Sequence, residues 1–125
     1  MSRILVADDD PDIVALVRIR LEMAGHEVVT APDGEAAHAL VLERRPDLAV
    51  LDLSMPRVGG LELTRRLRAA PETAELPIVI LTAAVQKADG EAALAAGATA
   101  YVKKPFSPKE LVVRVEALLA QAAGT

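Results

Sequence analysis

Residues 4–11 read Ile-Leu-Val-Ala-Asp-Asp-Asp-Pro, and this stretch decides the fold because it joins a buried strand to an acidic turn and a helix start. Four consecutive apolar residues are typical of a strand covered on both faces, as in a parallel sheet. Asp10 followed by Pro11 is typical of a helix N-cap with proline in the first turn. The stretch therefore predicts a strand, a polar turn and a helix in immediate succession.

The same order recurs along the whole chain. Further strands are predicted around Val28-Val29, at 48–52, at 78–81 and at Tyr101-Val102. Apolar residues at helical spacing predict helices that start after Asp10, Asp33 and Gly60, run over about 87–96, and begin at the capping box Ser107-Pro108-Lys109-Glu110. Strict alternation predicts one α/β domain over residues 1–122, a doubly wound, flavodoxin-like (βα)5 fold with a five-stranded parallel sheet, and a short tail at 123–125.

The composition argues against several classes of function. The chain has 125 residues, a net charge of −4 and no cysteine, and its lysines and arginines are scattered. We therefore expect no disulfide, no thiolate metal site and no direct binding of nucleic acid by this domain. No apolar stretch approaches the roughly 18 residues that span a bilayer, and no signal peptide is recognised at the N-terminus. The expectation is a soluble cytoplasmic domain without membrane contact.

Polar groups follow four of the predicted strands, at their C-terminal ends. They are Asp8, Asp9, Asp52, Thr82 and Lys104. Ligands of open α/β sheets bind outside this edge, so the five side chains are expected to converge. Neighbouring carboxylates repel unless a cation relieves the repulsion, and hard oxygen ligands favour Mg²⁺, with Mn²⁺ as the alternative. Asp52 is then either a third metal ligand or a nucleophile toward a phosphoryl group.

Thr82 and Lys104 indicate a functional site only when they are considered together with the three aspartates. Alone, a threonine at a strand end is usually a β-branched residue that finishes its strand, and a lysine there is usually a surface residue. Together they offer a hydrogen-bond donor and a positive charge to a bound phosphoryl group. Lys103 competes with Lys104, since alternation along a strand lets only one of the two point at the site. Pro105 suggests a cis peptide bond before it.

Four stretches, 4–10, 51–56, 81–83 and 101–106, together resemble the receiver domain of bacterial response regulators in two-component signalling. The sequence is similar to the single-domain chemotaxis type, in order and spacing, from Arg3 to about residue 120. The resemblance implies that Asp52 is the phosphoacceptor, and that Mg²⁺ is held by Asp8, Asp9, Asp52 and the backbone carbonyl of Ser54. It also implies that Lys104 and Thr82 contact the phosphoryl group and that Tyr101 is an aromatic switch.

The resemblance further implies a mode of signalling. A sensor histidine kinase or phosphotransfer protein would be the donor, and a downstream effector protein or domain would read the surface around the fourth helix, the fifth strand and the last helix. The domain would catalyse only its own phosphorylation and dephosphorylation, and phosphorylation-dependent dimers occur in the family. Val58-Gly59-Gly60 departs from the usual Met-Asp-Gly, and Ser54 and Ala84 occupy positions that tune the lifetime of the phosphoryl group.

Other functions fit less well. An aspartate-nucleophile phosphohydrolase usually carries a second acid two residues after the nucleophile, where this chain has Ser54. A flavodoxin-like module that binds FMN needs a hydroxyl- and glycine-rich loop after the first strand, where this chain has three aspartates. A degenerate receiver that binds partners without phosphorylation is the remaining alternative. His26 and His38 are interpreted as structural residues, neither phosphodonors nor metal ligands.

Overall fold

The computed structural model describes residues 2–83 and 87–124, and strands and helices alternate along them as the sequence predicts. The strands are β1 (Arg3–Ala7), β2 (Glu27–Ala31), β3 (Leu48–Asp52), β4 (Ile78–Thr82) and β5 (Ala100–Lys103). The helices are α1 (Pro11–Met23), α2 (Gly34–Arg44), α3 (Gly60–Ala69), α4 (Lys87–Ala95) and α5 (Pro108–Gly124). The predicted fold class, a five-stranded sheet with five helices, is confirmed.

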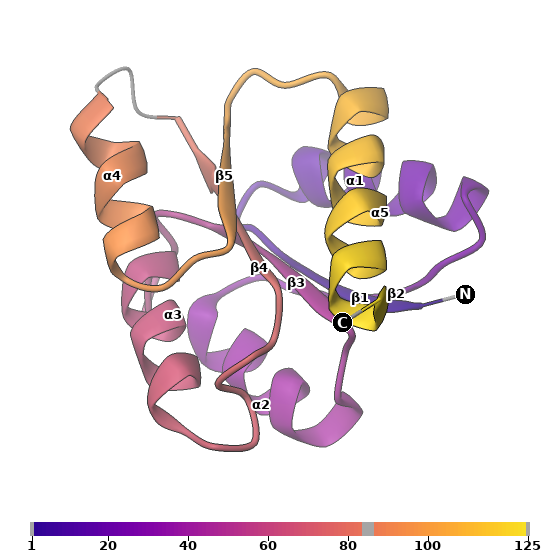
Figure 1. Ribbon diagram of the computed structural model, residues 1–125. Helices are drawn as coiled ribbons and strands as arrows, with labels where there is room; N and C mark the ends of the chain where they lie inside the picture. Colours follow the sequence, from indigo (N-terminus) through magenta and orange to yellow (C-terminus); the bar gives the residue numbers. More distant parts are fainter. Residues whose placement is uncertain (1, 84–86, 125) are drawn as a thin grey trace.

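The strands form one parallel sheet in the order β2-β1-β3-β4-β5. The chain leaves β1 toward one edge of the sheet and returns to the other side of β1 at β3. Figure 1 shows α1 and α5 on one face of the sheet and α2, α3 and α4 on the other. The point where the direction reverses, between β1 and β3, is where such sheets place their ligands.

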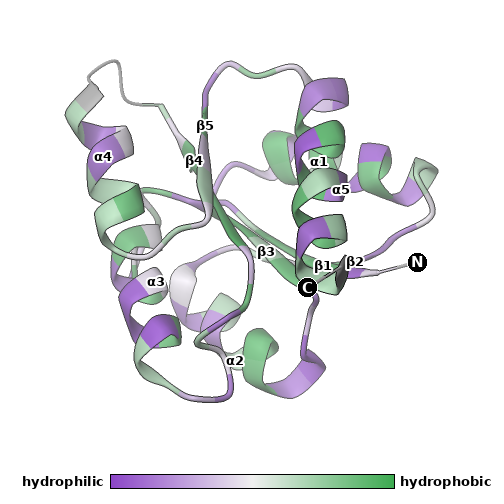
Figure 2. Ribbon diagram, viewed as in Figure 1, coloured by the Kyte–Doolittle hydropathy of each residue, from purple (hydrophilic) through white to green (hydrophobic). Residues whose placement is uncertain are grey.

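Two apolar layers hold the helices to the sheet, and alternate residues of each strand supply them. Ile4 and Val6 of β1 face α1 and α5, and Leu5 and Ala7 face the opposite layer. The strands are accordingly among the most hydrophobic segments of the chain (Figure 2). With a single phenylalanine, a single tyrosine and no tryptophan, the core is made of aliphatic side chains.

The helix starts follow the predicted capping chemistry. The Asp10 carboxylate accepts a hydrogen bond from the amide of Asp12 at the start of α1, and Asp33 accepts one from Ala36 at the start of α2. Before α5, the hydroxyl of Ser107 accepts from the amide of Glu110 at 3.3 Å. These bonds satisfy amides that have no partner inside their own helix.

The C-terminal end differs from the prediction. The expected tail at 123–125 is helical in the structure as far as Gly124, because α5 continues through Gln121, Ala122 and Ala123. Alanine and glutamine are strong helix formers, so small side chains here extend the helix. In residues 2–83 and 87–124, no helix combines the length and the apolar character needed to cross a membrane.

Candidate functional site

The predicted site residues come from four strands, and the topology brings those strands side by side. Asp8 directly follows β1, Asp52 is the last residue of β3, Thr82 is the last residue of β4, and Lys104 directly follows β5. Since all strands are parallel and β1, β3, β4 and β5 are consecutive in the sheet, these residues occupy one edge.

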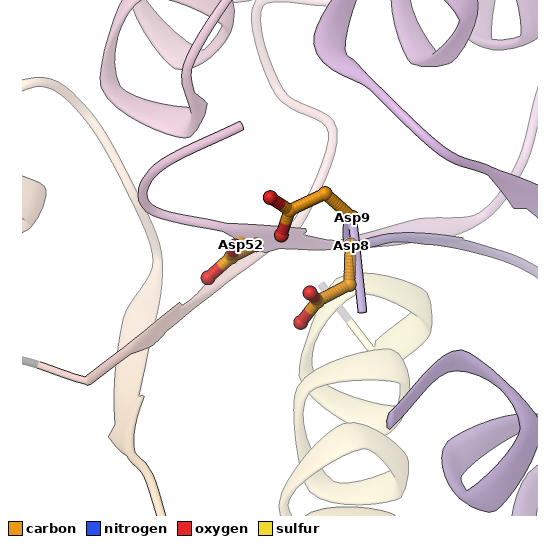
Figure 3. A group of neighbouring side chains, drawn as sticks. All are labelled: Asp8, Asp9 and Asp52. Carbon is orange, nitrogen blue, oxygen red and sulfur yellow. The ribbon is translucent and has the colours of Figure 1, made fainter. Parts of the chain in front are cut away.

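An acidic cluster occupies the reversal point of the sheet. Asp8, Asp9 and Asp52 each offer a carboxylate oxygen, and these oxygens all lie within 4.8 Å of one another. Figure 3 shows the three side chains at the ends of two neighbouring strands. Asp8 and Asp52 are buried, with exposed fractions of 1% and 6%, and Asp9 is exposed. Two of the carboxylates are thus removed from water, and charge repulsion is screened less in the protein interior than in water.

Lys104 bridges the two buried acids. Its Nζ lies 2.9 Å from Asp8 Oδ2 and 3.0 Å from Asp52 Oδ1. The backbone fixes its position, because the Lys104 amide donates a 2.7 Å hydrogen bond to the carbonyl of Thr82. Lys103 is exposed, so the choice that the sequence left open falls on Lys104. The Lys104-Pro105 peptide bond is cis, as predicted.

Burial and charge act in opposite directions on the titrating groups. Burial raises the pKa of Asp52 above its ordinary value, the charges of Asp8 and Asp9 raise it further, and the hydrogen bond and charge of Lys104 only partly offset them. For Lys104, burial lowers the pKa, but the hydrogen bonds and charges of Asp8 and Asp52 outweigh burial and hold the pKa above its usual value. The ammonium therefore stays charged, and the cluster carries unrelieved negative charge.

A hollow of about 370 Å³ opens beside the acids. It is lined by Asp52, Leu53, Ser54, Ala83 and Lys104. The nucleophile candidate, the cation and the segment that holds the Ser54 carbonyl therefore face one space. Thr82 is buried at the adjoining strand end. Ala84, at one of the positions expected to tune the phosphoryl lifetime, lies outside the described residues.

Close backbone approaches shape the segment after Asp52, and the sequence did not predict them. A Cβ on Gly60 would collide with the carbonyl of Asp52, and a Cβ on Gly34, at the start of α2, would collide with the carbonyl of Val58. Arg57 has a φ of 71° in the same segment. Glycine is ordinary at a helix start whether or not backbone packs against it, so its presence gives no signal for these contacts.

Neither histidine belongs to the acidic cluster. His26 accepts a hydrogen bond at Nδ1 from the amide of Ser2 and pairs through Nε2 with Glu116, at 3.1 Å. It therefore links the N-terminal segment to α5, which agrees with its interpretation as a structural residue.

The donor set suits a hard divalent cation. Carboxylate oxygens from Asp8, Asp9 and Asp52 are the ligands that Mg²⁺ and Mn²⁺ prefer, and they form the one such cluster of acids, histidines and cysteines within the described residues. A divalent cation would offset both the burial of Asp52 and the charges of Asp8 and Asp9, which together raise the pKa of Asp52. The residues present thus fit a Mg²⁺ site that adjoins the hollow beside Asp52.

A parallel α/β sheet with an acidic cluster and a lysine at its reversal point is typical of α/β domains that bind a divalent cation. The sequence matches the response regulator receiver domain family over residues 4–116. The chain therefore belongs to this family, which confirms the resemblance seen in its four sequence stretches.

Curated relatives agree with this assignment. The chain is 42% identical over 116 residues to the phosphate regulon transcriptional regulatory protein PhoB of Pseudomonas aeruginosa, covering 93% of this chain and 51% of the relative. It is 46% identical over 119 residues to the DNA-binding dual master transcriptional regulator RpaA of Synechocystis, covering 95% of this chain and 49% of the relative. The chain thus spans about half the length of these relatives.

Solved structures show the same fold. The receiver domain of the Francisella response regulator 1452 superposes with a TM-score of 0.91 at 32% identity, covering 98% of this chain and 99% of that one. The chemotaxis protein CheY4 of Vibrio cholerae superposes with a TM-score of 0.88 at 32% identity, covering 94% and 98%. The chain is a receiver domain of the two-component type and belongs to a signalling family.

Proposed function

We propose that this domain is a phosphorylation-dependent switch whose phosphoacceptor is Asp52. One observation carries the proposal: a buried carboxylate with a raised pKa lies 3.0 Å from a lysine ammonium, in a hollow, beside two further acids. The receiver domain spans residues 1–122 in this proposal. A carboxylate held in such a place is both a nucleophile and a group that gains from a new charge partner.

The reaction is a phosphoryl transfer from a phosphohistidine on a sensor histidine kinase or phosphotransfer protein. An oxygen of Asp52 attacks phosphorus, the phosphorus–nitrogen bond breaks, and the imidazole leaves with a proton from water. The product is an acyl phosphate on Asp52. Lys104, already within 3.0 Å of Asp52 and 2.9 Å of Asp8, orients the acceptor before transfer and supplies positive charge to the phosphoryl oxygens afterward. Hydrolysis of the acyl phosphate by water returns Asp52 to its carboxylate.

Asp8, Asp9, Asp52 and the Ser54 carbonyl would hold the metal, Mg²⁺ in our proposal and Mn²⁺ as a substitute. When bound, the cation would neutralise the oxygens of the transferred group. The metal requirement follows from the acids themselves, since a phosphoryl group with a charge of roughly −1.5 to −2 replaces the single negative charge of the Asp52 carboxylate at a site that is already negative.

The signal leaves through neighbouring elements. The hydroxyl of Thr82 donates a hydrogen bond to a phosphoryl oxygen. The backbone carbonyl of Thr82 accepts a hydrogen bond from the Lys104 amide, so the ends of β4 and β5 respond together. Tyr101 then moves inward, and the surface of α4, β5 and α5 changes for a downstream effector protein or domain. Two states that differ by a few kcal/mol suffice for such a switch. Phosphorylation-dependent dimerisation through this surface and a cytoplasmic location complete the proposal.

Intact mass tests it directly. The protein is incubated with Mg²⁺ and acetyl phosphate, and a single phosphoryl adduct is expected that disappears with EDTA and in Asp52→Asn. The matched control is Asp47→Asn, the same substitution directly before the opposite end of β3, which should be phosphorylated like the wild type. No adduct in the wild type, with Mg²⁺ binding intact, would favour a degenerate binding module. Continuous release of phosphate from many substrates would favour a phosphohydrolase.

A further inference from the structure

Gly90 lies inside α4, where glycine is an unfavourable residue for a helix. Glycine in a helix interior costs roughly 1 kcal/mol relative to alanine. Gly90 is nevertheless placed within α4 and is buried. A cost of this kind is expected where another group must come close to the backbone.

The group that comes close is the ring of Tyr101. A Cβ built on Gly90 would lie 2.6 Å from Cε2 and 2.8 Å from Cε1 of Tyr101, and nearer still to Cζ. Real Cβ atoms do not approach carbon this closely, so the hydroxyl end of the ring occupies the space of the missing side chain. Among the described glycines from Gly25 to Gly97, Gly90 is the one that an aromatic ring approaches in this way.

We infer that Gly90 is a positioning residue of the switch, because its missing side chain forms the notch in which the Tyr101 ring rests against α4. The inference rests on the role of Tyr101 in the proposed function and adds the residue that sets the resting position of the ring. Tyr101 belongs to β5, which lies between α4 and α5 (Figure 1). The notch therefore couples the position of one aromatic side chain to the helix on which the output surface depends.

A second position is open to the Tyr101 ring. On the side of α5, a hollow of about 240 Å³ is lined by Tyr101, Phe106, Glu110 and Arg114, among others. Since the colliding atoms belong to the far end of a side chain, rotation of the ring would relieve the collision without a backbone shift. Gly90→Ala should therefore fold and should expel the ring from α4 toward this hollow. The ratio of the two ring positions should shift by about tenfold or more, because a state of roughly 0.1–10% population becomes the main one.

The chain carries its own reporter for this experiment, since Tyr101 is the single tyrosine and tryptophan is absent. We would measure quenching of tyrosine fluorescence by acrylamide in the full chain, before and after phosphorylation with acetyl phosphate and Mg²⁺. In Gly90→Ala, quenching without phosphorylation should exceed that of the wild type. The decrease in quenching that phosphorylation causes in the wild type, when the ring moves inward, should be lost in the variant.

Two variants separate the steric effect from helix propensity. Ala92→Gly weakens the interior of α4 two residues from Gly90, on another face of the helix, and Gly90→Ala/Ala92→Gly offsets the added propensity while keeping the new Cβ. The double variant should behave like Gly90→Ala, and Ala92→Gly like the wild type. Equal quenching in the unphosphorylated wild type and Gly90→Ala would overturn the inference, as would the same increase in Ala92→Gly.

Failure of the proposed function can be distinguished from failure of the inference about Gly90. If mass spectrometry shows no adduct on the wild type, the function fails, and the comparison of unphosphorylated proteins still decides whether Gly90 positions the ring. If the adduct forms in both proteins and Gly90→Ala keeps the full phosphorylation-dependent change in quenching, the function stands and the positioning role of Gly90 in the switch is refuted.

Discussion

Asp52→Asn should make the metal-free protein more stable at pH 7, although it removes one partner of an ion pair. Burial and the charges of Asp8 and Asp9 together raise the pKa of Asp52 more than Lys104 lowers it, so the charged form is held at a cost in the folded protein. At an effective dielectric constant of about 20, the opposite charge of Lys104 at 3.0 Å attracts by about 5.5 kcal/mol, and each of the two like charges within 4.8 Å repels by about 3.5 kcal/mol or more. The two repulsions together are at least as large as the attraction, and lost hydration adds a cost of several kcal/mol for a buried ion.

The expected gain is on the order of 1–2 kcal/mol in the free energy of unfolding, because Lys104 keeps Asp8 as its partner when the second buried carboxylate is neutralised. The sign with pH follows from the raised pKa. The folded protein holds the Asp52 proton more tightly than the unfolded chain, whose pKa is close to 3.8, so stability falls as pH rises through the window above 3.8. The advantage of Asp52→Asn should therefore be larger at pH 7 than at lower pH, and it should shrink as the pH is lowered toward 4.

Urea unfolding followed by far-ultraviolet circular dichroism, in EDTA and then in excess Mg²⁺, measures both effects. Mg²⁺ should stabilise the wild type more than Asp52→Asn, because the variant lacks a ligand; at one hundred times the dissociation constant, binding adds about 2.7 kcal/mol. Glu72→Gln, an exposed acid after α3, controls for the loss of one negative charge. If Asp52→Asn unfolds in EDTA at the same or a lower urea concentration than the wild type, attraction to Lys104 exceeds the cost of burial, and the reasoning is wrong.

Three further substitutions test other contacts. Lys104→Gln should lower metal-free stability by about 2–4 kcal/mol, because it leaves buried carboxylates without their cation, and Mg²⁺ should restore most of the loss in urea unfolding. Gly34→Ala should cost about 1–3 kcal/mol, since its Cβ overlaps the Val58 carbonyl, and a thermal midpoint equal to that of the wild type would contradict this. Arg45→Gly should stabilise the protein by about 0.5–1 kcal/mol, measured as a small rise in melting temperature, because Arg45 ends α2 with a φ of 48°.

The order of strands and helices could be predicted because each boundary carries a local chemical signal. Asp10-Pro11, Asp33 and Ser107 cap their helices as their side chains require, and the apolar runs mark strands covered on both faces. The end of α5 could not be predicted in the same way. Small residues at a C-terminus fit a helix and an irregular tail equally well by composition, and only the structure distinguishes the two.

The site was predictable as a set of strand ends, because topology turns strand ends into neighbours. Asp8 and Asp52 are 44 positions apart, and their carboxylates meet only through the pairing of β1 with β3. Contacts that depend on a missing side chain carried no such signal. Gly90 is a weak point in a helix when considered from the sequence alone, and the ring of Tyr101 against it gives the reason for its presence.

The charges of the acidic site oppose the stability of the fold, and in the proposed function this opposition would give the switch its direction. Asp8 and Asp52 are buried at the end of two central strands, where one ammonium serves both carboxylates. The unphosphorylated, metal-free domain therefore retains electrostatic strain at the sheet edge, as the raised pKa of Asp52 shows. In the proposed function, a cation would relieve it, and a phosphoryl group on Asp52 would draw Lys104 from a shared position between two acids toward a single stronger partner. Because the Lys104 amide is bonded to the carbonyl of Thr82, a shift of that lysine reaches β4 and β5 together, beside the ring that rests on Gly90.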